Sequence, residues 1–314
     1  MTSTIVIPAY NEEKTLPALL RDIAAQRGAD PQVVVADAES TDRTREIARS
    51  RGATVVEGGL PAAGRNSGAR DADTDILIFL DADVRIPKRF VRTVCDAMEG
   101  RDLVAATCPM KPLSRLSTDR VIHNFANLFV RLTQYSDPNA PGYCIAIRRD
   151  VFERIGGFDE SLKVAEDHDL VKRAAKHGAF RVVPDTHVRV DVRRFEKEGR
   201  VGYSLKAIKV SLHRALVGEI REDDDVVDYE FGDYSEDSPK GAMRALRRLE
   251  KAMLKLDSKT TDVDEAIVDQ GTRAVDAAVE NTIAALRNAW DILMNQSDLS
   301  RRDSDRSESD RPAR

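Results

Sequence analysis

Short, uninterrupted apolar runs constrain the fold of this chain more than any other feature of its sequence. They occupy residues 5–7, 33–35, 54–56, 76–80 and 103–106, with helix-like segments between them. A strand that is buried on both faces needs no polar alternation, so such runs are typical of parallel strands covered by helices. The sequence therefore predicts an α/β fold built on a central sheet.

The connections between these runs carry helix signals. Thr15 stands where an N-cap oxygen is expected, Pro17 falls in the first turn, and Gly28 follows as a stop. The apolar residues of this segment share one helical face: Leu16, Leu19, Leu20 and Ile23. A second helix is expected between residues 40–42, whose short side chains can cap it, and Gly52.

Charge and cysteine content exclude several functional classes. Lys and Arg number 49 against 54 Asp and Glu, a net charge of −5, so no global positive field is available to hold nucleic acid. The three cysteines include no C-x-x-C pair, which argues against a disulfide framework and a thiolate zinc site and favours a cytoplasmic protein. We expect neither a signal peptide nor a membrane-spanning segment, because no apolar window approaches about 18 residues.

The composition changes after residue 217. We expect a main domain over residues 1–217, a solvated acidic linker over 218–239, an amphipathic helical extension over 240–296 and a disordered tail over 297–314. The basic segment 240–259 suits either an anionic membrane surface or the acidic groups of the main domain. The later helix looks like a bundle or dimer element, so homo-oligomerisation is a further hypothesis.

Two carboxylates follow the longest apolar run. Asp81 and Asp83 are separated by one residue at the carboxyl end of residues 76–80, where ligands bind in open α/β sheets. Paired hard oxygens suit Mg²⁺ or Mn²⁺ bound to substrate phosphates. The alternative is an ordinary Asp-rich turn at a strand end.

A second acidic site opens a helical segment at Glu166 and Asp167. The free N–H groups and the dipole of a helix start stabilise an ionised carboxylate, and such a group can serve as a general base. The alternative is simple charge complementarity at a helix N-terminus.

Residues 58–68 form a glycine-rich stretch that superficially resembles a phosphate-binding loop. Arg65 and Asn66 follow Gly64, so the Lys-Ser/Thr pair of a P-loop is missing, and the dinucleotide fingerprint after the first strand is also missing. Arg65 is instead a candidate phosphate contact, because its planar guanidinium donates several hydrogen bonds.

These motifs, taken in order, resemble glycosyltransferase family 2 over about residues 4 to 195. The stretches that carry the resemblance are Val6-Ile7-Pro8-Ala9-Tyr10-Asn11-Glu12-Glu13, Asp37-Ala38-Glu39-Ser40-Thr41-Asp42, Gly64-Arg65-Asn66-Ser67-Gly68, Asp81-Ala82-Asp83, Gly156-Gly157-Phe158-Asp159-Glu160 and Glu166-Asp167. The resemblance implies a GT-A type nucleotide-binding sheet with flanking helices, here followed by a C-terminal helical extension, and a catalytic domain over residues 1–217.

The resemblance also implies roles for individual residues on the donor side. Those that would border the nucleotide-sugar are Pro8, Tyr10, Asp37, Arg65, Asp81, Arg193 and Arg194. Asp83, with Asp81, would bind the Mg²⁺ or Mn²⁺ ion. Arg193 or Arg194 could hold the diphosphate through a bidentate contact.

On the acceptor side, the resemblance implies that Glu166 lies near the acceptor and that Asp167 is the catalytic base. Asp167 would take the proton from an acceptor hydroxyl while the metal stabilises the departing diphosphate, and a single displacement inverts the anomeric configuration.

The chain also departs from the family pattern. Asp37-Ala38-Glu39 stands where many members carry Asp-Asp-Gly, so the choice between UDP- and GDP-linked donors stays open. The Q-x-x-R-W motif of processive synthases is absent, which favours transfer of a single sugar. The apolar face within residues 118–142 is either core or a site for a lipid-linked acceptor.

The sequence thus predicts an inverting, metal-dependent glycosyltransferase that acts on a glycan or a lipid-linked acceptor, in the cytoplasm or at the cytoplasmic membrane face. A polyprenyl-phosphate monosaccharide synthase and a non-catalytic binding partner remain alternatives. A sugar nucleotidyltransferase is disfavoured, because its glycine-rich first loop is missing.

Overall fold

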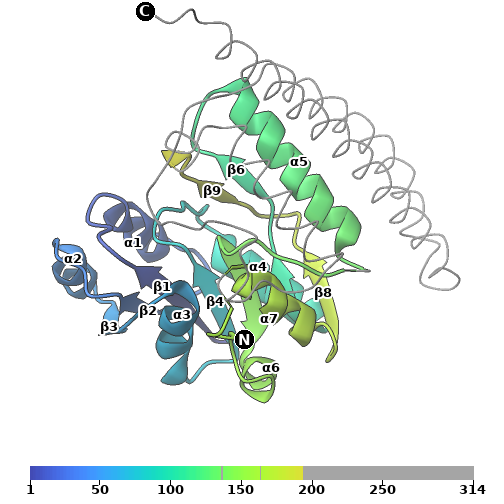
Figure 1. The fold of residues 1–314 in the computed structure, drawn as a ribbon, viewed down its shortest axis with the longest axis horizontal. Helices are drawn as coiled ribbons and strands as arrows, with labels where there is room; N and C mark the ends of the chain where they lie inside the picture. The colour runs from blue at the N-terminus through green and yellow to red at the C-terminus, as the bar shows by residue number, and fades with distance from the viewer. Residues whose placement is uncertain (136, 163, 194–314) are drawn as a thin grey trace, which may run out of the picture. The chain divides into compact units, whose positions relative to one another are not determined.

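The fold is a layered α/β arrangement in the computed structural model, which describes residues 1–135, 137–162 and 164–193 (Figure 1). The predicted α/β class is therefore confirmed. The expected linker over 218–239, the helical extension over 240–296 with its basic segment 240–259, and the tail over 297–314 lie outside the described residues.

Seven strands form the main sheet. In chain order they are β1 (Ser3–Ala9), β2 (Gln32–Asp37), β3 (Thr54–Glu57), β4 (Ile76–Leu80), β5 (Leu103–Thr107), β7 (Cys144–Arg148) and β8 (Ala179–Val182). Their spatial order is β3-β2-β1-β4-β7-β5-β8. The five predicted apolar runs are β1 to β5, and the neighbouring pairs β1–β2, β2–β3 and β1–β4 are parallel as expected.

Strand β7 was not predicted, and it makes the sheet mixed. It lies between β4 and β5 and runs antiparallel to both, with Leu80 opposite Cys144. Its sequence, Cys-Ile-Ala-Ile-Arg, has only one charged residue and is as apolar as the other buried strands, but it follows a long helix rather than a βα repeat. Because β7 is antiparallel, the residues just before it lie at the same edge of the sheet as those just after β4.

Helices cover both faces of the sheet. They are α1 (Leu16–Ala24), α2 (Thr44–Ser50), α3 (Pro61–Arg70), α4 (Phe90–Gly100), α5 (Ser117–Thr133), α6 (Arg149–Arg154) and α7 (Glu166–Ala174). Residues of α1, α2 and α4 pack on one face with Ile5 and Ile7, whereas residues of α3, α6 and α7 pack on the other face with Val6. The alternation of adjacent strand residues between two buried layers explains why these strands read as continuous apolar runs.

The first two helices form as predicted, with one correction. The expected apolar face of α1 is buried. Thr15 does occupy the N-cap position, but its hydroxyl makes no capping bond to the helix and instead hydrogen-bonds to Glu12. Asp42 accepts a hydrogen bond from the backbone N–H of Thr44, at 2.9 Å, and so supports the start of α2.

Most of the glycine-rich stretch 58–68 belongs to helix α3 rather than to a phosphate-binding loop. Its glycines allow close packing on β1: a Cβ atom added to Gly68 would lie 2.4 Å from Cγ1 of Val6. Glycine lowers helix propensity by about 1 kcal/mol, and here tertiary packing overrides that cost.

Helix α5 packs on a small second sheet formed by β6 (Met110–Pro112) and β9 (Val188–Val190). The side-chain amide of Asn127 in α5 exchanges two hydrogen bonds with the backbone of Met110, at 2.8 and 2.9 Å. Ile122 and Leu128 of this helix are buried, as the core interpretation of the 118–142 face predicts. None of the helices in the described ranges has both the length and the apolarity needed to cross a bilayer.

Candidate active site

The predicted site residues gather at one edge of the main sheet. Asp37 ends β2, Asp81 directly follows β4, and the parallel register pairs Ala9 of β1 with Asp37. Gly142 precedes the antiparallel strand β7 and therefore reaches the same edge. This is the edge at which open α/β sheets bind their ligands.

Asp37 is a buried carboxylate, with 1% of its surface exposed. One oxygen, Oδ2, accepts a hydrogen bond from the backbone N–H of Ser40, at 3.0 Å, and another from the guanidinium of Arg45. The other oxygen, Oδ1, is buried and has no hydrogen-bond partner within the described part of the chain. Of the two predicted neighbours in the first motif, Pro8 is half-buried and Tyr10 is exposed.

The departure of the second motif from Asp-Asp-Gly has a backbone consequence. Glu39 has a φ of +57°, which is the left-handed region that glycine adopts without strain. A glutamate at this position carries a conformational cost that the family's glycine avoids.

Arg65 of α3 connects the two acidic motifs. Its Nη1 lies 2.7 Å from Oε1 of Glu166, and its Nη2 lies 3.0 Å from Oδ1 of Asp81. Only 5% of the arginine side chain is exposed, against 19% and 17% for the two carboxylates. One buried guanidinium therefore holds the end of β4 and the start of α7 together across the site.

Charges inside this cluster shift its pKa values. Burial alone would lower the pKa of Arg65, but the charges of Asp81, Glu166 and Asp167 raise it, so the guanidinium stays charged. Burial raises the pKa of Glu166, the neighbouring charge of Asp167 raises it further, and Arg65 opposes both effects. The site is thus a dense acidic cluster organised around one cation.

Asp167 lies in the first turn of α7, and its Oδ1 accepts a hydrogen bond from the backbone N–H of His168, at 2.8 Å. The Nε2 atom of His168 lies 4.0 Å from the same oxygen. The described residues provide no hydrogen bond to Oδ2. Glu166 is committed to Arg65, so Asp167 is the better placed of the two to accept a proton.

Gly142 adjoins Arg65 and Asp167, and sequence reasoning did not single it out. A Cβ atom at Gly142 would lie 2.8 Å from Nη2 of Arg65 and 3.2 Å from Oδ2 of Asp167. Glycine therefore lets the backbone approach both charged groups closely. The sequence signal was available, because Pro141-Gly142 lies one residue before the apolar run that forms β7.

The Gly156-Gly157-Phe158 motif packs against Arg65 through the ring of Phe158. The guanidinium carbon of Arg65 lies 5.4 Å from the centre of the Phe158 ring. Asn66 holds this loop through two bonds to the backbone of Phe158, one donated to the carbonyl at 2.9 Å and one accepted from the N–H at 2.8 Å. Arg65 and Asn66 are consecutive residues of α3, so one turn of helix fixes both the charged bridge and the ring beneath it.

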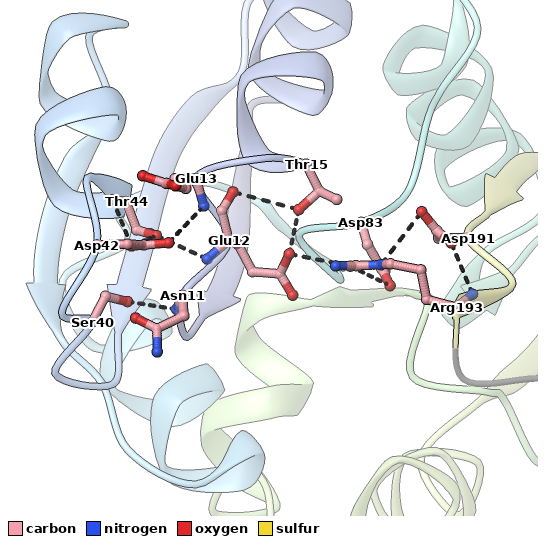
Figure 2. Close-up of polar contacts among 10 residues, drawn as sticks. All are labelled: Asn11, Glu12, Glu13, Thr15, Ser40, Asp42, Thr44, Asp83, Asp191 and Arg193. Atoms are coloured by element: carbon pink, nitrogen blue, oxygen red, sulfur yellow. Dashed lines mark hydrogen bonds and ion pairs between the residues drawn. The ribbon is translucent and has the colours of Figure 1, made fainter. Parts of the chain in front are cut away.

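Asp83 forms part of a second charged group, drawn in Figure 2. Nη2 of Arg193 lies 3.4 Å from Oδ2 of Asp83 and 3.2 Å from Oε2 of Glu12. Arg193 also bonds to Asp191, through Nε at 3.4 Å and through its backbone N–H at 2.9 Å. The predicted diphosphate contact Arg193 therefore lies beside the predicted metal ligand, whereas Arg194 lies outside the described residues.

The loop after β1 is held by side chains from the loop after β2 (Figure 2). The backbone N–H of Asn11 donates to the side chain of Ser40, at 2.9 Å, and that of Glu13 donates to the side chain of Asp42, at 3.1 Å. The N–H of Glu12 donates to the hydroxyl of Thr44, at the start of α2, at 2.8 Å. Three consecutive bonds fix the loop that carries Glu12.

The donor atoms at this edge suit a divalent ion that also binds phosphate. Among the described residues, no group of three or more Asp, Glu, His or Cys side chains is placed to enclose a metal. Mg²⁺ and Mn²⁺ sites that share substrate phosphates need only one or two carboxylates, and Asp81 and Asp83 supply hard oxygens at a partly exposed strand end. The chemistry of these two residues thus fits such an ion.

Comparison with known proteins identifies the family. Residues 4–156 match the family model described as glycosyl transferase family 2. An uncharacterized glycosyltransferase of Haemophilus influenzae is 26% identical over 199 residues, which cover 56% of this chain and 63% of the relative. An undecaprenyl-phosphate 4-deoxy-4-formamido-L-arabinose transferase of Aeromonas hydrophila is 36% identical over 116 residues, covering 32% of this chain and 35% of the relative. The chain spans less than two thirds of the length of these relatives.

Solved structures share the fold. The mannosyltransferase PcManGT from Pyrobaculum calidifontis, solved with GDP-Man and Mn²⁺, matches with a TM-score of 0.55 and 20% identity, covering 91% of this chain and 85% of that one. TarS of S. aureus, residues 1–349 with UDP-GlcNAc, matches with a TM-score of 0.51 and 21% identity, covering 71% and 68%. The motifs, the sheet and the family model agree: residues 4–156 match glycosyl transferase family 2, and the described part of the chain shares the GT-A fold of these neighbours.

Proposed function

We propose that the chain is an inverting, metal-dependent glycosyltransferase, which moves one sugar from a nucleotide-diphosphate sugar to a hydroxyl of a glycan or of a lipid-linked saccharide. The observation that carries this proposal is the bridge from Asp81 through Arg65 to Glu166. It ties a donor-side carboxylate to the carboxylate pair that contains the candidate base.

The proposed reaction is one displacement. The acceptor oxygen forms a bond to the anomeric carbon, the bond from that carbon to the diphosphate oxygen breaks, and the hydroxyl proton passes to Asp167. Asp167 suits this role because one of its oxygens is held by a backbone N–H, which orients the other, and because the start of a helix stabilises its charge. Arg65 fixes the positions of the two carboxylates that it contacts, Asp81 and Glu166.

On the donor side, Asp37 and the half-buried Pro8 border the nucleoside in this proposal, with the exposed Tyr10 beside them. Asp37 Oδ1 is a buried acceptor that a base N–H would satisfy. Asp81 and Asp83 would hold Mg²⁺ or Mn²⁺, which supplies positive charge to the leaving diphosphate. Arg193 adds a second positive charge in the same region.

The comparisons support the coarser parts of this proposal. The relatives are named glycosyltransferases, and one of them acts on undecaprenyl phosphate. Neighbours of the same fold were solved with GDP-Man and Mn²⁺ and with UDP-GlcNAc, so UDP- and GDP-linked donors both remain in the proposal. The relative that acts on undecaprenyl phosphate favours one alternative, a polyprenyl-phosphate monosaccharide synthase.

A transfer assay tests the proposal. The full chain is incubated with labelled UDP- and GDP-sugars, Mn²⁺ and either glycan acceptors or polyprenyl phosphate in vesicles. We expect a product with one added sugar and inverted anomeric configuration by NMR, and we expect Asp167→Asn to abolish it. A sugar attached directly to lipid phosphate selects the synthase, and retained configuration or full activity of Asp167→Asn would overturn the mechanism.

A further inference from the structure

Arg193 joins three segments that are distant in the sequence. Glu12 follows β1, Asp83 follows β4, and Asp191 follows β9, yet all three carboxylates contact this one guanidinium (Figure 2). The arginine side chain is 43% exposed and the three carboxylates are between 19% and 25% exposed. The group therefore lies at the border of the site, where water and ions reach it.

The contact of Arg193 with Asp83 is longer than its contact with Glu12. A single nitrogen, Nη2, is shared between Glu12 and Asp83, and the bond to Glu12 is the shorter, at 3.2 Å against 3.4 Å. Asp191 receives Nε and the backbone N–H. Two of the three carboxylates can thus keep the guanidinium in place when the third turns away.

The guanidinium and a divalent ion would compete for Oδ2 of Asp83. An ion bound at Oδ2 would stand within a few ångströms of Nη2, and like charges at that distance repel, even in a partly hydrated site. Binding of the ion through this oxygen therefore favours opening of the pair between Arg193 and Asp83. Glu12 offers Nη2 an acceptor that needs no large movement of the side chain.

We propose that Arg193 is an internal counter-ion of Asp83, which a divalent cation replaces, and that Glu12 is the positioning residue that retains the guanidinium when the exchange occurs. The inference rests on the proposed function in one respect only, which is that Asp83 binds the cation. It adds a role for Glu12 and an antagonism between Arg193 and the ion.

Glu12 is itself held rigidly enough for this role. Its backbone N–H donates to Thr44 Oγ1, and its carboxylate also accepts the hydroxyl of Thr15. The hydroxyl of Thr15, which makes no capping bond to α1, thus orients the Glu12 carboxylate that contacts Arg193. After the exchange the guanidinium remains charged at the edge of the site, available to the donor diphosphate.

The test measures Mn²⁺ binding to the full chain, without donor, by electron paramagnetic resonance of the free ion. Arg193→Gln removes the competing charge, so we expect Mn²⁺ affinity to rise roughly three- to tenfold. Arg193→Lys keeps the charge, and its affinity should stay within about twofold of the parent.

Glu12→Gln should have the opposite effect. With Glu12 neutral, Nη2 relies on Asp83, and Mn²⁺ affinity should fall about threefold. In the Arg193→Gln background, Glu12→Gln should lower the Mn²⁺ affinity less than it does in the parent. This difference shows that Glu12 acts through Arg193 and not by a direct effect of its own charge on the ion. Glu13→Gln is the matched control, because Glu13 pairs with Arg43 instead, and it should leave the affinity unchanged.

The possible results distinguish metal binding by Asp83 from the exchange of Arg193 for the metal ion. If Asp83→Asn binds Mn²⁺ as tightly as the parent, Asp83 is not the ligand and the metal part of the proposed function fails. If Asp83→Asn loses the ion but Arg193→Gln binds it no more tightly than the parent, the exchange is overturned while the proposed function stands. Equal effects of Glu12→Gln in both backgrounds would overturn the role of Glu12.

Discussion

Arg65 and Glu166 are 101 residues apart in the chain, and their side chains meet at 2.7 Å inside the site. Their contact joins helix α3, which packs on strands β1 and β2, to helix α7, which carries the candidate base. The same guanidinium contacts Asp81. The geometry of the site therefore depends on a single buried cation.

Substitution of Arg65 should destabilise the fold as well as the site. Arg65→Met leaves Asp81 and Glu166 without their counter-ion, and removing one partner of a buried ion pair costs about 3–5 kcal/mol. Arg65→Lys keeps the charge but cannot present two nitrogens in a fixed fork, so we expect a smaller loss of about 1–3 kcal/mol. Guanidinium chloride unfolding measures both.

Arg154→Met is the control for Arg65, because the ion pair of Arg154 with Asp150 is exposed and lies on one helix, α6. We expect its unfolding midpoint to stay close to that of the parent. If Arg65→Met were as stable as Arg154→Met, the bridge would not hold the two helices together.

Gly142→Ala should impair transfer more than stability. The added methyl group would lie 2.8 Å from Nη2 of Arg65 and 3.2 Å from Oδ2 of Asp167, so both groups must shift. Displacements of this size at reacting groups reduce kcat roughly tenfold or more. Gly100→Ala, whose methyl group meets no atom within 4 Å, should retain full activity and provides the comparison. Unchanged kcat in Gly142→Ala would remove Gly142 from the site.

Two glycines of α3 should respond to alanine with opposite signs. Gly68→Ala places a methyl group 2.4 Å from Val6, and overpacking of this kind costs about 1–3 kcal/mol. Gly64→Ala meets no atom closer than 3.6 Å and should gain about 0.5–1 kcal/mol from helix propensity. Chemical unfolding of both variants decides the matter, and equal shifts would show that α3 does not pack on β1 as described.

The free energy of unfolding should depend on pH through the protonation of Glu166. Burial and the charge of Asp167 raise the pKa of Glu166, with Arg65 opposing them, so the folded state binds this proton more tightly than the unfolded state. The contribution of Glu166 to stability is then present below its unfolded pKa and is lost as the pH rises through the folded pKa. The unfolding free energy of the parent should therefore fall relative to that of Glu166→Gln as the pH rises above about 4.5, the ordinary pKa of a glutamate.

Glu153→Gln, which changes an exposed glutamate of α6, should show no such trend and serves as the control for this titration. A parent that gains stability relative to Glu166→Gln over the same pH range would show that Arg65 outweighs burial at Glu166.

The sequence was most informative where apolar burial alone decides the structure. Strands β1 to β5 and the buried face of α1 follow from runs and periods that need no tertiary context. Helix α3 could not be predicted in this way, because glycine at positions 64 and 68 disfavours a helix locally and serves the packing against Pro8 and Val6. Strand β7 was missed because an antiparallel insertion breaks the expected alternation of strands and helices.

The candidate site shows the same division. The positions of Asp37 and Asp81 follow from the rule that ligands bind at the carboxyl ends of strands, and Asp167 from the signals of a helix start. The bridge through Arg65, the close approach of Gly142 and the pair formed by Glu12 and Arg193 depend on tertiary contacts, such as those across the 101 residues between Arg65 and Glu166 and the 181 between Glu12 and Arg193. No local pattern encodes such contacts.

If this edge of the sheet binds a nucleotide-sugar through a divalent ion at Asp83, thermal unfolding with a panel of UDP- and GDP-sugars will detect the binding. With Mn²⁺ present and a donor at about 100 times its Kd, we expect the Tm to rise by roughly 5 °C or more. The shift should vanish in Asp83→Ala and persist in Asp167→Asn, whose role concerns the acceptor. No shift with any donor, or an equal shift in Asp83→Ala, would contradict the account.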